Sequence, residues 1–230
     1  ESTGEVFVQR SQLGGGSPIL RGFEANRILL MVDGVRLNNA IYRSGHLQNA
    51  ISVDPFLLEN TEVIFGPSSL IYGSDALGGV IHFKTKRPRF LGEDGAGRIS
   101  LQAAQRFTTA TEENTSHWDL GVSGKRVAWI GSVTKSQFGI VTMGKKRMHG
   151  DDRWGLIPEY VTTIGGQDSI IPNPDPSSTP NSGYTQYDLA QKLNFALSDS
   201  TRLLLNVQYS TSTDVPRSDQ LATYRDGQLR

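Results

Sequence analysis

The 230-residue sequence contains no cysteine, so it has neither disulfide bonds nor thiolate metal ligands. It has no run of about 18 apolar residues, which excludes a membrane-spanning helix but not a membrane barrel, whose strands need only about 9–11 residues each. Basic and acidic residues balance at 23 each and form no long basic run, so no nucleic-acid partner is expected. The sequence begins at Glu1 without a targeting stretch and stops in mid-pattern, so we expect a piece of a longer protein.

Glycine is abundant instead, with 25 residues, and the stretch "GPSSLIYGSDALGGVI" at residues 66–81 is rich in it. Glycine-rich loops often bind phosphate groups. Gly73 and Gly78 have the spacing of a Walker loop, but Gly79 occupies the position where that loop needs lysine. No GxGxxG motif is present either. We therefore interpret these glycines as residues of a turn that leads into a strand.

The sequence changes character near residues 84–97, a stretch of charge, proline and glycine. Before it, "RILLMVDGVRLNN" predicts a β-hairpin that turns at Asp33 and Gly34, because this pair tolerates the positive φ angles of a tight turn. Asp54 and Pro55 fit the N-cap and first position of a short helix, and "TEVIFG" then predicts a strand.

A second short helical turn is expected to begin at Pro67 and end at Gly73, and "GVIHFKT" predicts the next strand. These short elements, joined by many turns, indicate an α+β domain in the first part of the chain.

The second part alternates with period two, which predicts long strands in a sheet with one apolar and one polar face. Leu203 and Leu205 fall on one face of such a strand, and Arg202 and Asn206 on the other. Five strands are expected, in "GRISLQAAQRF", "HWDLGVS", "VAWIGSVTK", "QYDLAQKLNFAL" and "TRLLLNVQYST".

The expected connections alternate in length: a medium loop at 108–116, tight turns at 124–126 and 198–200, and a very long loop at 138–184. Short turns at one end and long loops at the other are typical of an outer-membrane barrel, although a soluble antiparallel sandwich also alternates. Charged residues on the inward face, and Trp118 and Tyr209 near expected strand ends, favour the barrel.

The stretches "SPILRGFEANRILLMVDGVRLNN" and "VDPFLLENTEVIFGPSSLIYGSDALGGVIHFKTKRP" resemble the plug domain of TonB-dependent outer-membrane receptors. The resemblance covers most of residues 5–88, and the rest of the chain is similar to the start of the barrel that follows. It implies a plug domain at 1–88, a linker at 89–97 and antiparallel transmembrane barrel strands at 98–230. The strands would belong to a barrel of about twenty-two, with 138–184 as an extracellular loop.

The family resemblance also implies a function. The plug would gate the barrel in the outer membrane of a Gram-negative bacterium, among its lipids, and the inner-membrane protein TonB would drive uptake of a scarce ligand. Ferric siderophores, haem and cobalamin are the usual ligands of the family. The sequence Gly-Pro-Ser-Ser differs from the Lys-Asp-Ala-Ser run that the polysaccharide importers of the family tend to have there, which favours iron or haem over glycans. No covalent chemistry, cofactor or metal site of the protein's own is implied.

Residues 39–50 match the plug loop that faces the ligand, where Tyr42, Arg43, His46 and Gln48 offer a ring, a cation and polar groups. Each could equally be a solvated loop residue, and His46 could also be a haem ligand. The residues expected to shape or gate the plug are Arg21, Gly22, Asp33, Gly34, Glu62, Gly66, Pro67, Tyr72, Gly73, Gly78 and Gly79.

Three of these plug positions carry a specific expectation from the family. Arg21 matches an arginine that pairs with barrel carboxylates, whereas Phe65 replaces the second such arginine. Glu62 stands where other members have a buried acid, and its partner cannot be named from the sequence.

Two other classes of protein stay open. A β-rich ligand-binding or adhesion module without transport would place its strands against a second sheet. An enzyme would need clustered acids, bases or nucleophiles, and only His149 with the Asp151 and Asp152 pair comes near this. The Asp151 and Asp152 pair could be a metal site, but we expect a solvated loop of mixed charge there instead.

Overall fold

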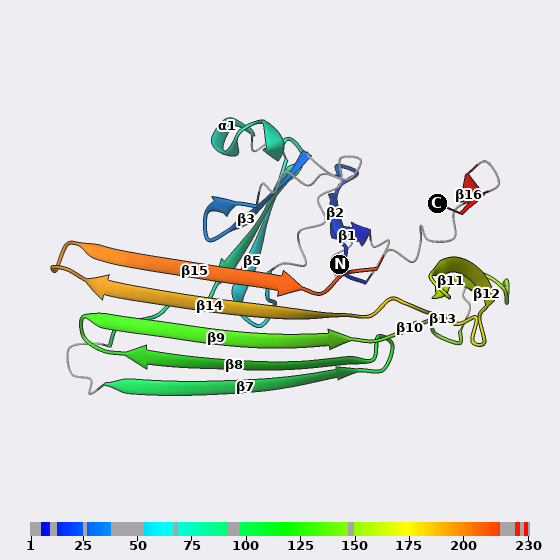
Figure 1. Cartoon of the computed structure of the whole chain (residues 1–230). Coiled ribbons are helices and arrows are strands. Elements are labelled where there is room, and N and C mark those ends of the chain that lie inside the picture. Colours follow the sequence, from blue (N-terminus) through cyan, green and yellow to red (C-terminus); the bar gives the residue numbers. More distant parts are fainter. Residues whose placement is uncertain are drawn as a thin grey trace.

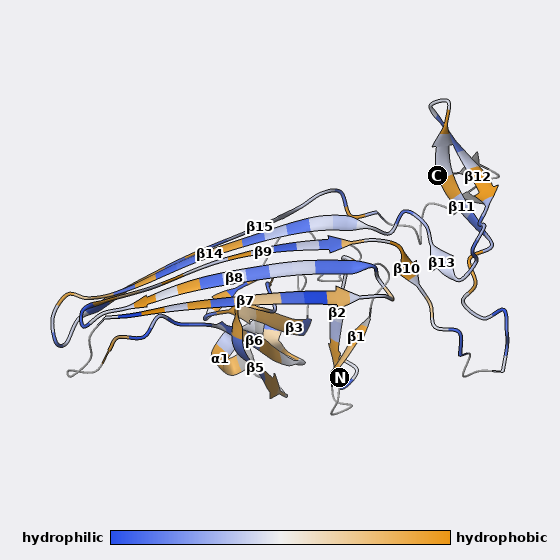
Figure 2. Cartoon of the chain, turned by 90° about the horizontal axis from the view of Figure 1, so that it is seen from below, coloured by the Kyte–Doolittle hydropathy of each residue, from blue (hydrophilic) through white to orange (hydrophobic). Residues whose placement is uncertain are grey.

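The computed structural model describes residues 6–9, 13–24, 27–37, 53–66, 69–91, 97–146, 150–216, 224–225 and 228–229. It consists of a small unit formed by the described residues between 6 and 91, here called the N-terminal unit, and a sheet of long strands beside it (Figure 1). The N-terminal unit lies on one side of the long sheet in both overall views (Figures 1 and 2). The fold is therefore α+β followed by antiparallel strands, as the sequence predicts.

The N-terminal unit is built on a four-stranded sheet in the order β4-β3-β6-β5. Its strands are β3 (Ile28–Val32), β4 (Val35–Arg36), β5 (Leu58–Phe65) and β6 (Gly79–Thr85), and β3 runs parallel to β6 while the other pairs are antiparallel. A further antiparallel pair joins β1 (Val6–Gln9) to β2 (Ser17–Leu20). The helical elements are short, α1 (Ser69–Tyr72) and the 3-10 turn η3 (Ser74–Ala76).

The central strands β3 and β6 are covered on both faces, which explains why "ILLMV" is apolar without alternation. Two separate clusters of buried side chains result. The first contains Leu20, Ile28, Leu30 and Ile81, and the second contains Leu29, Met31, Ala76 and Val80. Every one of these residues belongs to the N-terminal unit, so this unit has a core of its own.

The predicted hairpin at Asp33 and Gly34 is confirmed, with Val32 opposite Val35. The helix expected at Asp54 and Pro55 is wrong. The chain makes a single turn there, in which Asp54 Oδ1 accepts a hydrogen bond of 2.9 Å from Phe56 N. Strand β5 already starts at Leu58, which leaves no room for a helix, and the capping signal serves a turn instead.

The long sheet has five antiparallel strands in the order β15-β14-β9-β8-β7 (Figure 1). They are β7 (Arg98–Thr108), β8 (Glu113–Ser123), β9 (Val127–Phe138), β14 (Tyr184–Ala196) and β15 (Arg202–Ser212). All five predicted strands are confirmed. Their lengths of 11–13 residues are sufficient to cross a membrane at a tilt, which takes about 9–11 residues.

The two faces of the long sheet differ in the way predicted. Figure 2 shows hydrophilic and hydrophobic residues following one another along its strands. On β8, His117 and Asp119 are buried, whereas Trp118, Leu120 and Val122 are exposed. On β14, Asp188 and Lys192 are buried and Leu189 and Phe195 are exposed. Polar side chains therefore lie beneath the N-terminal unit and apolar ones point away from it, the reverse of a sheet in a soluble sandwich.

The connections of the long sheet match the prediction except at one place. Tight turns join β8 to β9 and β14 to β15, but the medium loop expected at 108–116 is also a tight turn, at residues 109–112. The sequence "TTATEENTS" is polar on both faces, so its strand ends show no hydrophobic alternation. Because β8 starts earlier than expected, Trp118 lies in the middle of the strand and not near its end.

The long connection after β9 contains secondary structure of its own. It includes β11 (Glu159–Ile164) paired with β12 (Gln167–Pro172), and β10 (Val141–Thr142) paired with β13 (Ser178–Thr179). Near the end of the chain, β16 (Tyr224–Arg225) pairs with β17 (Gln228–Leu229). Within the described residues, no helix is long and apolar enough to cross a membrane.

Candidate functional site

The candidate site is the polar contact between the N-terminal unit and the long sheet. Its first anchor is an ion pair in which Lys192 Nζ of β14 lies 2.8 Å from Asp33 Oδ2 at the hairpin turn. The Lys192 side chain is only 1% exposed. Lys192 also donates to Thr85 Oγ1 at the end of β6. A buried ammonium needs such partners, because an uncompensated charge there costs several kcal/mol.

Asp33 collects donors from both sides of this contact. Its Oδ2 accepts from Thr85 Oγ1 at 2.6 Å and from Asn206 Nδ2 at 2.9 Å, and Oδ1 accepts from Thr85 N at 2.9 Å. Burial alone would raise the pKa of Asp33, but the hydrogen bonds from Lys192 and Thr85 hold this pKa below its ordinary value. Asp33 is thus an ionised carboxylate clamped between the hairpin and the sheet.

The tight turn places Asp33 at this contact. Asp33 and Gly34 have φ angles of 49° and 88°, the left-handed pair that a two-residue hairpin with type I′ geometry needs. Gly34 N donates to His82 Nε2 of β6 at 2.9 Å, which ties the turn to the neighbouring strand. The Asp-Gly pair therefore does more than turn the chain, since it presents the carboxylate to β14.

The second anchor joins the turn after residue 53 to strands β8 and β9. Thr134 Oγ1 donates to Asp54 Oδ2 at 2.6 Å, and His117 Nδ1 lies 2.6 Å from the same Thr134 hydroxyl. On the other side of the ring, His117 Nε2 lies 3.3 Å from Asp119 Oδ2. Lys86 Nζ donates to this Asp119 oxygen at 2.6 Å. The four residues of this hydrogen-bond chain, Asp54, Thr134, His117 and Asp119, are all buried.

An aromatic contact supports the second anchor. The ring of Phe56 stacks on His117, with centroids 5.1 Å apart and 15° between the planes. The guanidinium of Arg106 on β7 lies 5.1 Å from the Phe56 centroid, and Arg106 pairs with Glu113 at 2.6 Å. The 53–57 turn is therefore attached to the long sheet by hydrogen bonds, stacking and a cation–π contact.

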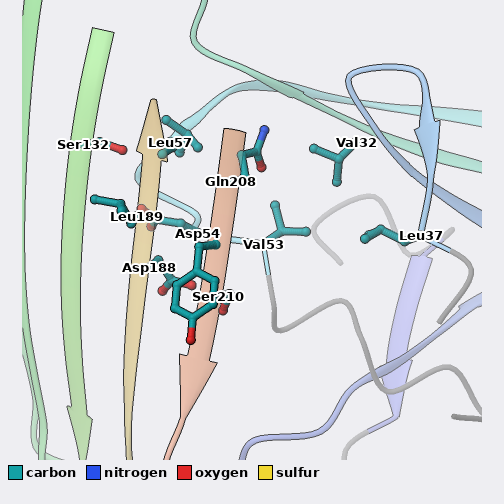
Figure 3. A pocket seen from close by; sticks show the side chains of 12 residues that line it. Val32, Leu37, Val53, Asp54, Leu57, Ser132, Asp188, Leu189, Gln208 and Ser210 are labelled. Carbon is teal, nitrogen blue, oxygen red and sulfur yellow. The ribbon is translucent and has the colours of Figure 1, made fainter. Parts of the chain in front are cut away.

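A cavity of about 270 Å³ lies between the N-terminal unit and the long sheet, next to Asp54 of the second anchor (Figure 3). The N-terminal unit lines it with apolar side chains such as Val32, Val53 and Leu57, whereas Asp188, Gln208 and Ser210 come from the long sheet. The two parts thus touch through anchors and do not close-pack between them.

Two of the plug positions singled out in the sequence, Arg21 and Phe65, contact each other in the structure. The Arg21 guanidinium lies 4.5 Å from the ring centroid of Phe65, the residue that replaces the second arginine of the family. Arg21 and Gly22 form the turn at the end of β2, with φ angles of 46° and 84°.

Glu62 corrects an expectation. It pairs with Lys84 on β6, and its side chain is 46% exposed, so it is not a buried acid in this structure. Lys84 lies diagonally across the sheet, because the register places it opposite Asn60 and places His82 opposite Glu62. The hydrogen bond from Lys84 lowers the pKa of Glu62.

The glycine-rich stretch forms α1, η3 and the start of β6, as interpreted from the sequence. Gly79 shows why glycine is needed, because a Cβ there would lie 2.5 Å from the carbonyl oxygen of Ile64. Gly78 N donates to Arg27 O at 2.7 Å, and Tyr72 packs against the second core cluster. Positive φ angles occur at Gly66 and Gly73 as well.

Several predicted positions lie outside the described residues. They are Tyr42, Arg43, His46 and Gln48 of the ligand-facing loop, together with Pro67 and His149. Within the described part of the chain, no three His, Asp or Glu side chains gather in a group that could hold a metal ion. Asp151 accepts a hydrogen bond from Arg153 N at 2.9 Å, an ordinary loop contact.

The sequence reasoning did not identify the partners in the two anchors. Alternation with period two puts Lys192 and His117 on the polar faces of their strands, but it does not reveal their contacts with Asp33 and Asp54. A single lysine in the middle of a strand whose outer face is apolar is a usable signal, since a charge at that depth needs an opposite charge.

Comparison with known proteins identifies both parts. Residues 2–80 match the TonB-dependent Receptor Plug Domain family. The chain is 30% identical over 211 residues to the vitamin B12 transporter BtuB of Vibrio vulnificus, covering 89% of this chain and 32% of that protein. It is 42% identical over 82 residues to a hemin receptor of Yersinia enterocolitica, covering 36% of this chain and 11% of that protein.

Among solved structures, the copper transporter OprC has a similar fold, with a TM-score of 0.63 and 15% identity over 90% of this chain and 27% of that one. The chain therefore spans about a third or less of the length of these relatives. The N-terminal unit corresponds to their plug, and the long sheet to part of the barrel wall. The chain belongs to the family of TonB-dependent receptors.

Proposed function

We propose that the whole protein imports a scarce ligand across the bacterial outer membrane, with the plug gating the barrel and TonB supplying the driving force. The ligand class is haem or a ferric siderophore. The relatives are named for transport or reception, which suits a transporter better than an enzyme.

One observation carries this proposal: a plug with its own core is attached to the polar face of a barrel wall through a few buried charges. The two core clusters contain plug residues only. Lys192 to Asp33 and His117 with Thr134 to Asp54 then form the attachment. A body attached in this way can move without opening its own core, which is what gating requires.

The alternative, an adhesion or binding module without transport, explains the outer face less well. Val207 and Tyr209 on β15 are 63% and 61% exposed, and Ile99 on β7 is 74% exposed. A second sheet would cover such residues in a sandwich. Lipid would solvate them in an outer membrane, so the apolar outer face supports a barrel wall in that membrane.

The preference for haem or iron rests on the plug. It follows from the sequence of the Gly-Pro-Ser-Ser turn at residues 66–69, because the relatives point both ways. A match of 42% identity over 82 residues is to a hemin receptor, and one of 45% over 69 residues is to a vitamin B12 transporter. Cobalamin is therefore the competing ligand. The plug loop with Tyr42, Arg43, His46 and Gln48 is the proposed ligand contact.

The test uses the full-length receptor in the outer membrane of cells with and without TonB. Labelled haem, a ferric siderophore and cobalamin are supplied separately at limiting concentration. We expect one of the first two to accumulate only when TonB is present. Accumulation of cobalamin alone would contradict the ligand class, and binding without TonB-dependent uptake of any ligand would contradict transport.

A triple change of Tyr42, Arg43 and His46 to Ala tests the loop at matched surface abundance. Loss of two contacts of about 1 kcal/mol each would weaken binding roughly thirtyfold. Unchanged binding would assign recognition to the barrel loops alone.

A further inference from the structure

The second anchor contains a histidine whose protonation state can be deduced from its hydrogen bonds. His117 on β8 is 2% exposed and lies between Thr134 and Asp119. Neither ring nitrogen is free to face water. The donors and acceptors around the ring must therefore decide which nitrogens carry protons.

The Nδ1 side is decided by Asp54 and Thr134. Asp54 accepts on both carboxylate oxygens, from Phe56 N at 2.9 Å and from Thr134 Oγ1 at 2.6 Å, as an ionised carboxylate does. A threonine hydroxyl has a single proton, and in this arrangement Thr134 gives it to Asp54. At 2.6 Å from the same hydroxyl, His117 Nδ1 must then be the donor.

The Nε2 side is decided by Asp119. Its Oδ2 lies 3.3 Å from Nε2 and accepts from Lys86 Nζ at 2.6 Å. A lone pair on Nε2 would face a carboxylate oxygen, whereas an N–H there makes a charge-assisted hydrogen bond. Both nitrogens of the ring are then protonated.

We propose that His117 is a buried imidazolium that positions the plug on the barrel wall. Its charge links the Asp54 turn of the plug, through Thr134, to Asp119 of the wall. The proposal goes beyond transport itself, because it concerns how the plug is held whatever the ligand.

The surrounding charges are compatible with this state. Asp54 comes from the plug, Asp119 from β8 and Lys86 from the segment after β6, so His117 and Lys86 balance two carboxylates. Arg106 on β7 is paired with Glu113, and Asp188 on β14 lies across the cavity and accepts from Gln186 at 3.0 Å. Such compensation is what a buried charge needs. The stacked Phe56 ring also suits a cation.

The first test is the nitrogen NMR spectrum of the full-length receptor with labelled histidine, near neutral pH. We expect both His117 nitrogens to show protonated-type signals. His82 is the internal reference, because its Nε2 accepts from Gly34 N and therefore carries no proton. His117→Gln assigns the signal by difference. A pyridine-type signal for His117 Nδ1 would overturn the proposal, since it would mean that Asp54 carries the proton and donates to Thr134.

Asp119→Asn gives a second reading that does not need a histidine variant. It keeps the shape of the side chain but removes the charge next to Nε2, so His117 should lose a proton and a pyridine-type signal should appear. An unchanged spectrum would contradict the assigned role of Asp119.

The positioning role is tested by hydrogen exchange of residues 53–58 in the same full-length receptor. His117→Gln should accelerate exchange there by about tenfold or more, the size of a lost hydrogen bond to a charged group. Ser116→Ala is the matched control, because Ser116 points to the opposite face of β8 and bonds to Gln105. Equal exchange in both variants would show that His117 does not hold the plug.

Discussion

Lys192 and Asp33 are separated by 159 positions in the sequence, yet Nζ and Oδ2 of these two residues lie 2.8 Å apart. The pair joins the middle of a barrel strand to the tip of a plug hairpin. It also fixes which end of the plug strands approaches the wall, because Asp33 lies in the turn that joins β3 to β4.

Removing the lysine of this pair should loosen the plug. In the full-length receptor, Lys192→Met leaves the partly buried Asp33 carboxylate without its cation, and we expect a loss of up to about 3–5 kcal/mol in the stability of the plug contact. Denaturant unfolding followed by plug-specific hydrogen exchange measures this loss.

Two further variants make that measurement decisive. Lys135→Met removes an exposed lysine on β9 that contacts Tyr187, so its effect should stay within about 0.5 kcal/mol. The double variant Lys192→Met with Asp33→Asn should cost less than the two single changes together. Strict additivity would mean that the pair contributes no coupling.

The Asp33 anchor should also respond to acid. Because the folded-state pKa of Asp33 lies below the ordinary value of 3.8, its contribution to stability is present above that value and is lost as the pH falls through the folded-state pKa. The difference in unfolding midpoint between wild type and Asp33→Asn should therefore be the same at about pH 7 and about pH 5, and should shrink below about pH 4. A difference that already shrinks between the two higher values would be inconsistent with a lowered pKa.

Adjacent residues of β15 should tolerate charge very differently. Leu205 faces outward, whereas Asn206 donates to Asp33 Oδ2 at 2.9 Å. Leu205→Arg should cost about 2–4 kcal/mol near the middle of the membrane, and Asn206→Arg much less, because arginine can still donate to Asp33. Folding yields of the full-length receptor, read from heat-modifiable migration, compare the two. Equal yields would place the strand one residue out of register.

Residues 1–230 alone should not form a stable membrane species. The five-stranded sheet ends at β7 and β15, and unpaired backbone groups cost several kcal/mol each in lipid. Expression of this segment with outer-membrane targeting should give no heat-modifiable, protease-resistant product. Recovery of such a product would show that the open edges find partners in another way.

Much of this fold can be predicted from the sequence, because each face of a long strand lies in a single environment, either lipid or a polar interior. The alternation of Leu203 and Leu205 with Arg202 and Asn206 reflects lipid on one side and a polar interior on the other, so the strand and its facing were predictable. Residues 108–116 were assigned to a loop because both of their faces are polar, and hydrophobic period two disappears there although the backbone stays paired.

The candidate site was less predictable than the fold. Thr85, Asn206 and Lys192 meet at Asp33 only after three segments of the chain are brought together. The sequence shows that a lysine on the polar face needs a partner, but the choice of partner depends on where the plug lies. In the same way, the sequence around Asp54 predicts a helix cap, but one oxygen of its carboxylate accepts a hydrogen bond from Thr134 of the barrel wall.

The separation of the plug core from the barrel wall has a consequence for reversibility. Leu20, Ile28 and their neighbours pack only with plug residues, and the described contacts with the wall are mostly polar. Water can take the place of a polar partner, so a hydrogen bond exchanged in this way contributes only about 0.5–1.5 kcal/mol net. Water could not replace the partners of an apolar contact of the same area in this way. A plug displaced from the wall can therefore form the same contacts again without refolding its core.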